Sequence, residues 1–360
     1  MSRIGNLGNR LYRGEVSYDI VGRRRFWYVV SAVILSVSIL TLVLRGLNLG
    51  IEFKGGAEFT LPVKNPTTAS VTQARQAVTA TGTEVSSVMI VGGDKIRVQT
   101  QEVSTTESEK VGNALANEFD VTVNDIKVQL VGPSWGSEVS KNAARALIVF
   151  LILVALFLAI YFEWPMAIAA LVALAHDVVI TVGIYALSGF EVTPATVIGF
   201  LTILGYSLYD TVVVFDKVKE NTKGITGGSR MTYTEASNLA LNQTLVRSIN
   251  TSVVALLPVF SILVVGVALL GAGTLNDLAL ALFVGMLVGT YSSIFIATPI
   301  LAQIKERSSE MKSLRKRVMN RRANAGIEGD VVVAPTASFV ASAGPRQQRV
   351  KRSRAERSGR

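Results

Sequence analysis

The sequence contains no cysteine and a single histidine, His176. The absence of thiols excludes a disulfide framework, a thiolate metal site and a cysteine nucleophile, and one imidazole excludes a multi-histidine metal cluster. The G-x-x-x-x-G-K-[ST] string that cradles nucleotide phosphates is also missing. We therefore expect a protein that is not an enzyme, binds no metal or cofactor, and leaves any use of ATP to a partner.

Charged residues are scarce as well. They make up 17% of the 360 residues, whereas hydrophobic residues make up 49% and the mean hydropathy is +0.42. Soluble domains carry roughly a quarter charged residues. The net charge of +10 comes from clusters beside apolar segments and from one tail. This distribution favours a membrane protein with basic segments near lipid, and we expect no nucleic acid partner.

Six apolar segments are long enough to cross a membrane as helices, which takes about 20 residues. The first, 26–44, follows a cytoplasmic segment at 1–25, and we interpret it as a retained anchor because it is too long for a signal peptide and no small-residue cleavage site follows. The others form one block at 143–304, and the turns after its first two spans are very short. Its five spans are 146–162, 166–190, 194–215, 248–270 and 278–304.

Basic residues concentrate on one side of the predicted membrane. Residues 1–25 hold six Arg and two acids, 216–247 hold five basic and three acidic residues, and 304–360 hold fifteen against five. Residues 46–142 instead hold eight basic and eleven acidic residues. The positive-inside rule predicts that both termini are cytoplasmic and that 45–142 is extracytoplasmic. The basic tail, 305–360, is poor in large apolar residues and is expected to be disordered.

The extracytoplasmic region has the pattern of a small α+β domain. Strand-like segments at 58–61, 88–91, 96–98 and 126–130 alternate with helical segments near 70–81 and 107–119, and Gly92-Gly93-Asp94 forms a hairpin turn. The order β-α-β-β-α-β is that of a ferredoxin-like domain. The predicted fold class is thus an α-helical membrane protein with six spans and one small ferredoxin-like α+β domain.

Ionisable residues inside spans are costly and usually mark function. Asp177 lies near the middle of the third span beside His176, and Asp210 lies in the fourth span, about 9 Å from its cytoplasmic end at 1.5 Å per residue. Arg247 opens the fifth span from the same side, so it can meet Asp210 at similar depth. We expect a supporting polar seam made of His176 on the third span and of Tyr206, Ser207, Gln243, Asn250 and Thr251 on the fourth and fifth.

Small residues recur every four positions in the sixth span, at Gly285, Gly289 and Ser293. This pattern is typical of spans that pack closely against a neighbour.

Two interpretations of the buried charges stay open from the residues alone. Asp210 and Arg247 form a static pair that holds the bundle together, or Asp210 takes up and releases a proton while Arg247 moves towards it and away from it. Asp177 is a further candidate for proton coupling, and its only evident cationic partner is His176, which is equally suited to helix packing.

Five strings in order resemble the SecF family of the bacterial Sec protein-export machinery, part of the resistance-nodulation-division superfamily, over about residues 20–305. Glu52 and Tyr209 stand where the family usually has Asp and Asn. The strings are Gly50-Ile51-Glu52-Phe53-Lys54-Gly55-Gly56, Val131-Gly132-Pro133, Ala175-His176-Asp177, the run 205–216 and the run 242–252.

The resemblance implies a six-span half of a bundle completed by SecD, with the SecYEG channel, YajC and indirectly SecA as further partners. It implies use of the proton-motive force to draw unfolded preproteins across the bacterial cytoplasmic membrane, in contact with membrane lipids. It places Asp210 and Arg247 in the proton route. We expect Glu52, Gly55 and Gly56 to form a hinge to the outer domain, because glycine permits large backbone changes.

Three other classes remain to be tested. A proton-coupled exporter of small molecules or lipids from the same superfamily would typically need larger extramembrane domains. An intramembrane aspartyl protease would use Asp177 and Asp210 as a dyad. A structural scaffold would keep its buried charges only to fix its assembly.

Overall fold

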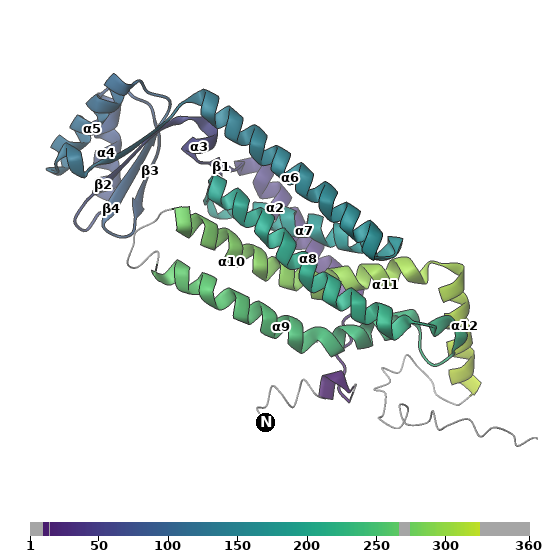
Figure 1. Ribbon diagram of the computed structural model, residues 1–360. Helices are drawn as coiled ribbons and strands as arrows, with labels where there is room; N and C mark the ends of the chain where they lie inside the picture. Colours follow the sequence, from purple (N-terminus) through teal and green to yellow (C-terminus); the bar gives the residue numbers. More distant parts are fainter. Residues whose placement is uncertain (1–9, 14, 266–273, 325–360) are drawn as a thin grey trace, which may run out of the picture.

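The computed structural model describes residues 10–13, 15–265 and 274–324. Six helical segments of this part are long and apolar enough to cross a membrane, which confirms the predicted number. They form an elongated bundle with a small sheet domain at one end (Figure 1). The segments are α2 (Arg24–Arg45), α6 (Pro133–Tyr161), α7 (Trp164–Ser188), α8 (Pro194–Thr222), α9 (Tyr233–Val265), and a last span in which α10 (Thr274–Ser292), the π-helical turn η4 (Ser293–Ala297) and α11 (Thr298–Glu306) follow one another directly.

Two helices begin well before the apolar segments that predicted them. Helix α6 starts 13 residues before residue 146, and α9 starts 15 residues before residue 248. Their first two turns carry polar residues such as Glu138 and Glu235, so hydropathy does not include these turns in the span. The last residues of the predicted fifth span, 266–270, lie outside the described residues.

The sheet domain, residues 56–131, has the predicted ferredoxin-like order. Its strands β2 (Gly56–Pro62), β3 (Val85–Val91), β4 (Lys95–Thr100) and β5 (Lys127–Val131) lie side by side as β3-β4-β2-β5, and every neighbouring pair is antiparallel. Helices α4 (Thr68–Ala80) and α5 (Thr105–Phe119) connect them, and the short η1 (Val123–Asp125) leads into β5. Thr67 and Ser104 cap the two helices by accepting hydrogen bonds from backbone N–H groups.

Alternate residues of the two central strands form the core of the sheet domain. Phe59 and Leu61 on β2 and Ile96 and Val98 on β4 are fully buried. They point to one face because side chains alternate along a strand. Helices α4 and α5 cover this face, and contribute the buried residues Ala74, Val78, Val111, Leu115 and Ala116.

A short segment joins the first span to the sheet domain. Strand β1 (Asn48–Leu49) pairs in parallel with β6 (Glu191–Val192), which forms the turn between α7 and α8. One helical turn, α3 (Ile51–Lys54), then leads to Gly55 and Gly56 at φ values of 80° and 134°. A Cβ atom on Gly56 would lie 2.4 Å from the carbonyl oxygen of Thr100, so both conformation and space require glycine here.

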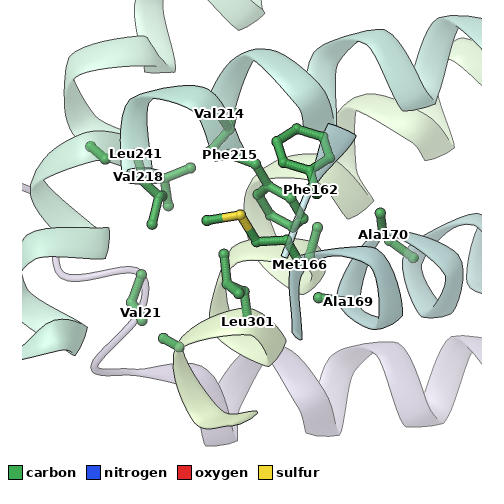
Figure 2. Packing of buried hydrophobic residues seen from close by; sticks show 14 of the residues in the cluster. Val21, Phe162, Met166, Ala169, Ala170, Val214, Phe215, Val218, Leu241 and Leu301 are labelled. Carbon is green, nitrogen blue, oxygen red and sulfur yellow. The ribbon is translucent and has the colours of Figure 1, made fainter. Parts of the chain in front are cut away.

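The bundle has a continuous apolar core in the half remote from the sheet domain. Met166 of α7 lies between Phe215 of α8 and Leu301 of α11, with Phe162 and Leu241 nearby (Figure 2). Helices α2, α6 and α9 expose long rows of apolar side chains, as expected for helices that contact lipid or another membrane subunit.

The start of the C-terminal tail differs from the expected disorder. Residues Ser309–Asn324 form helix α12, in which Met311, Leu314 and Val318 are buried and belong to the bundle core. These three residues lie at helical spacing on one face, which is enough to hold a strongly charged helix against the bundle. Arg322 also binds Glu235 of α9 with two hydrogen bonds, of 2.7 and 2.9 Å. Residues 325–360 lie outside the described residues.

Helices α8 and α10 approach closely through glycines of the four-residue repeat. A Cβ atom on Gly285 would lie 2.2 Å from Cδ1 of Ile203, and one on Gly289 would lie 2.8 Å from Cβ of Ser207. Gly199 makes the reciprocal approach to Ala281, at 2.7 Å. This spacing brings Asp210 on α8 level with the π-helical turn.

We predict that Gly285→Ala lowers the stability of the chain by about 1–3 kcal/mol, because the added methyl group overpacks the contact with the branched Ile203. Thermal unfolding in detergent measures this change. The matched control is Gly205→Ala on α8, where nothing lies within 4 Å of an added Cβ. That variant should be neutral or slightly stabilising, since alanine favours a helix over glycine. Equal melting of both variants would contradict the prediction.

Candidate functional site

Asp210 of α8 lies inside the bundle and is bound by hydroxyl groups from two other segments. Ser248 of α9 donates to Oδ1 at 2.6 Å, and Ser293 of the π-helical turn donates to Oδ2 at 2.5 Å. The residue is 6% exposed. Among the described residues, no basic side chain forms an ion pair with it. Three helical segments therefore meet at one carboxylate whose partners are neutral.

The π-helical turn places Ser293 against Asp210. Such turns are rare and occur often at functional sites. Pro299 lies two residues after this turn, and in a regular α-helix its ring would clash with the carbonyl of Phe295, four residues earlier. The wider turn ends at Ala297, just before this position. Proline therefore accounts for the local change from α-helix to π-helix. This change positions Ser293 against the carboxylate, whereas the four-residue repeat in the sequence indicates only a packing role for Ser293.

Asp177 of α7 has a separate set of partners. Ser207 of α8 donates to its Oδ2 at 2.5 Å, and Nδ1 of His176 lies 3.4 Å from its Oδ1. The carboxylate is 1% exposed. The His176 ring stacks on Tyr291, and Nε2 of His176 is buried without a hydrogen-bond partner among the residues that the structure describes. Because Ser207 precedes Asp210 by one helical turn, the two carboxylates are linked through the backbone of α8.

Arg247 does not reach Asp210. Its guanidinium lies on the exposed side of α9, with Nη2 3.5 Å from the hydroxyl of Tyr209. Tyr209 is 52% exposed, and Asn250, three residues after Arg247 on α9, is exposed as well. Thr251 donates to the backbone carbonyl of Arg247 at 2.8 Å. The fifth-span residues thus form a polar surface next to the carboxylate, with Ser248 as the connection to it.

Two further residues of the predicted seam lie in different surroundings. Tyr206 has its hydroxyl 3.4 Å from Ser252, which in turn accepts a hydrogen bond from Thr290 at 2.8 Å. Gln243 is not near the carboxylates: it accepts from Asn221 at 2.9 Å and donates to the carbonyl of Tyr12 at 3.1 Å. Gln243 therefore fastens the N-terminal residues to α9.

Sequence reasoning missed several polar contacts. Ser248 and Ser293 carry no charge, so nothing in an apolar window marks them as carboxylate ligands. Asn238 and Asn242 of α9 bind the backbone of residues 18–21, with the amide of Tyr18 2.7 Å from Asn242 Oδ1. The spacing of these asparagines, one helical turn apart on one face, was the available signal.

Charged residues also connect the sheet domain to the bundle. We call Glu58, Arg97, Gln99 and Glu191 the junction cluster. Arg97 of β4 lies 3.2 Å from Glu58 and 3.5 Å from Glu191, and Gln99 donates to Glu191 at 2.7 Å. Glu191 belongs to the turn between α7 and α8, so these contacts cross from the sheet to the membrane spans.

Acidic side chains outnumber basic ones in the cavity at this junction, which measures about 420 Å³. Glu52 of α3 and Asp277 of α10 line it together with Glu58, Arg97 and Glu191. Burial raises the pKa of Glu191, and the hydrogen bond from Gln99 and the charge of Arg97 only partly offset this effect. Glu58 and Glu52 raise it further by repulsion. Glu52 of the predicted hinge therefore lines the same cavity as Glu191, an acid whose pKa is raised by burial.

These features define a multi-pass helical membrane protein with a ferredoxin-like domain, a class represented by a solved structure of SecDF. That crystal structure, of a translocon-associated membrane protein from Thermus thermophilus, matches this chain with a TM-score of 0.72 and 31% identity, and the match covers 82% of this chain and 39% of that one. Residues 110–307 match the model of the protein export membrane protein SecD/SecF C-terminal family, and residues 41–67 match the SecD/SecF GG motif.

Two SecF proteins that match most of this chain agree with this assignment. The protein translocase subunit SecF of Streptomyces coelicolor is 49% identical over 98% of this chain and 97% of its own length. The SecF subunit of Mycobacterium tuberculosis strain H37Rv is 45% identical over 87% of this chain and 73% of its own. The chain therefore belongs to the SecD/SecF family, among the SecF subunits of the protein translocase. It is a transport protein and not an enzyme, which excludes the aspartyl protease.

We predict that docking of the sheet domain on the bundle weakens as pH rises. An acid with a raised pKa in the docked state holds its proton more tightly there than when exposed to water. Docking is then strongest below the ordinary glutamate pKa and weakens as pH rises from it to the raised value, by at most about 1.4 kcal/mol per pH unit. Because the chain has no cysteine, spin labels at Lys110→Cys and Leu187→Cys report the distance between the two parts.

Three variants test the role of the junction cluster. Glu191→Gln should remove most of the pH dependence, and Arg97→Gln should steepen it because Glu58 and Glu191 then repel each other without a cation between them. Glu118→Gln, on the exposed side of α5, should behave as wild type. A pH response that survives Glu191→Gln unchanged would show that another group controls docking.

Proposed function

We propose that this chain pairs with SecD in the bacterial cytoplasmic membrane and uses the proton-motive force to promote preprotein translocation through the SecYEG channel. YajC and, indirectly, SecA are the further partners. Its membership among SecF translocase subunits supports the transport role. The relative named SecDF is a longer protein, of which this chain covers 40%, and this supports a SecF portion that works beside a SecD portion.

The proposed orientation has both termini in the cytoplasm and the sheet domain outside. The excess of basic residues in segments 1–25, 216–247 and 304–360 supports this orientation. In the fold, residues 15–23 and α12 lie at the end of the bundle remote from the sheet domain (Figure 1). In this orientation the sheet domain can contact the preprotein where the preprotein leaves the SecYEG channel.

The single observation that carries the proton role is the hydroxyl shell of Asp210. A buried carboxylate is costly to ionise in a membrane unless it has partners. A serine hydroxyl can donate to a carboxylate and can also accept from a carboxylic acid. The contacts with Ser248 and Ser293 can therefore persist in both protonation states. Such a shell permits Asp210 to gain and lose a proton without leaving an orphaned partner.

Movement of a proton through this site would be coupled to the position of the helices. Ser248 and Ser293 belong to α9 and the last span, so a change of charge on Asp210 changes the forces between three segments. A unit charge that crosses the full potential releases about 2.3 kcal/mol per 100 mV, enough to bias a two-state arrangement. Arg247, exposed beside the carboxylate, is placed to approach Asp210 when the helices shift.

The junction provides a route from the spans to the sheet domain. Glu191 follows α7, which carries Asp177, and precedes α8, which carries Asp210. Arg97 and Gln99 bind Glu191 from the sheet. Tilting of α7 or α8 would thus move the sheet domain, while Gly55 and Gly56 act as the hinge. This sequence of movements would let the domain guide unfolded preprotein away from the channel.

A structural scaffold is the rival function. Its supporting observation is that the hydroxyl groups already satisfy Asp210 without Arg247. A small-molecule exporter has less support, because the apolar cavity that reaches a buried carboxylate, beside Asp177, measures about 210 Å³, below the usual size of ligand pockets. The cavities of about 420 and 1210 Å³ lie at the two ends of the bundle and are not lined by Asp177 or Asp210.

We predict that Asp210→Asn abolishes the gain in export provided by this chain, because asparagine cannot take up a proton. The measurement is export of a signal-sequence-bearing reporter in cells that lack the native copy, with membrane accumulation and SecD co-purification checked in parallel. Export should fall to the level of cells without the chain. The matched control is Asp216→Asn, an exposed acid on the same helix, which should export as wild type.

Two results would count against the proposal. Export by Asp210→Asn at the wild-type level, with normal assembly, favours the scaffold. Failure of the wild-type chain to restore export would contradict the translocase role itself.

A further inference from the structure

A cavity of about 1210 Å³ lies at the end of the bundle remote from the sheet domain. Its walls come from the segment 17–27, from α9, and from the helices α11 and α12. Arg23, Arg24, Arg25 and Arg315 line its polar part, and Trp27, Leu245, Ile249 and Phe295 line its apolar part. Neither the proton site nor the junction cluster uses these residues.

The backbone wall of the cavity is held in place by two buried asparagines. Asn238 Oδ1 accepts hydrogen bonds from the amides of Ile20 and Val21, each at 3.0 Å. The side-chain amides of Asn238 and Asn242 both donate to the carbonyl of Tyr18, at 3.0 and 2.9 Å. The segment before the first span is therefore fixed to α9, and the arginines that follow start from a defined position.

The acids that line the cavity already have partners. Asp19 accepts from the amide of Gly22 at 2.8 Å, and Glu235 is bound by Arg322 of α12. Glu306 lies 3.9 Å from Arg24 and 3.8 Å from Arg315. With Arg322 included, five arginines at the cavity (Arg23, Arg24, Arg25, Arg315 and Arg322) exceed these three acids by two positive charges.

Arg23 and Arg25 supply this remaining charge. Both are exposed, and within the described residues no hydrogen bond or ion pair engages either guanidinium. They also lie at the boundary where the apolar span begins, because Phe26 and Trp27 follow immediately. An anion bound here would sit at the depth of lipid headgroups.

The apolar part of the cavity continues towards the membrane interior. Trp27 packs on Phe295 with ring centroids 4.0 Å apart, and in the described part of the chain its buried Nε1 has no hydrogen-bond partner. Ile249 of α9 is 45% exposed. A soluble anion would leave this surface uncovered, whereas an acyl chain would cover it.

We propose that this cavity binds an anionic phospholipid, with its phosphate on Arg23 and Arg25 and one acyl chain along Ile249 towards Phe295. Basic pockets between spans on the cytoplasmic side suit such headgroups, and guanidinium groups bind phosphate through paired hydrogen bonds. The lipid would fill the space between the N-terminal segment, α9 and α12, and so tie the start of the first span to the fifth. This inference does not depend on the proton role of Asp210.

The test is retention of lipid by the full chain, purified with SecD in detergent and analysed by native mass spectrometry. Phosphatidylglycerol or cardiolipin should stay bound after washing, and phosphatidylcholine should not. The double variant Arg23→Gln and Arg25→Gln should lower retention roughly tenfold or more, because two charge contacts are lost. Arg23→Lys and Arg25→Lys should keep most of it.

The matched control is Lys312→Gln and Lys316→Gln on α12, which removes the same charge at the same end without touching the cavity. Equal loss of lipid in this control, or no loss in the arginine variant, would overturn the proposal. Displacement of the lipid by millimolar inorganic phosphate would also overturn it, since it would reveal a site for a free anion. If the arginine variant released SecD and kept its lipid, the cavity would be a subunit contact instead.

Discussion

Hydroxyl groups donate to the two carboxylates of the bundle interior, and the packing of the central helices is arranged around these contacts. A polar group in a membrane must find its partner inside the protein, because lipid offers none. Asp177 and Asp210 find theirs on the next helices, in Ser207, Ser248 and Ser293. Only close helix approach makes such short side chains sufficient, and glycines on α10 provide it. Packing and function therefore share the same residues.

The same arrangement explains why a change at one carboxylate would be felt widely. Asp210 touches α9 and the last span, and Ser207 connects α8 to Asp177 on α7. The turn between α7 and α8 carries Glu191, which binds the sheet domain through Arg97 and Gln99. The chain enters the sheet domain after α3 and leaves it into α6. Besides these two connections, this small set of polar contacts largely determines how the sheet domain and the bundle are coupled.

The two ends of the bundle are stabilised by different means. Near the sheet domain, a short strand pair and the junction cluster carry partly buried charge. At the other end, asparagine side chains bind an irregular backbone segment, and α12 packs on the bundle through three apolar residues and the pair between Arg322 and Glu235. Buried backbone groups of an irregular segment need hydrogen-bond partners, which accounts for Asn238 and Asn242 on one face of α9.

The amino-acid sequence by itself was enough to predict the number of spans, the ferredoxin-like order of strands and helices, and the SecF family. These depend on local periodicity and on the length of apolar runs, which each segment carries by itself. The sequence also singled out Asp177 and Asp210, because a charge in an apolar run is conspicuous. It did not reveal their partners, since serine has no such signal in a span.

Tertiary structure decided the rest. It placed Arg247 beside Tyr209 and away from Asp210, because the direction of an α9 side chain depends on how that helix is rotated against α8. It ordered residues 309–324 as a helix, because three apolar side chains became worth burying once the bundle offered a surface for them. Local pattern fixes which segments form, whereas the contacts between segments exist only after they pack.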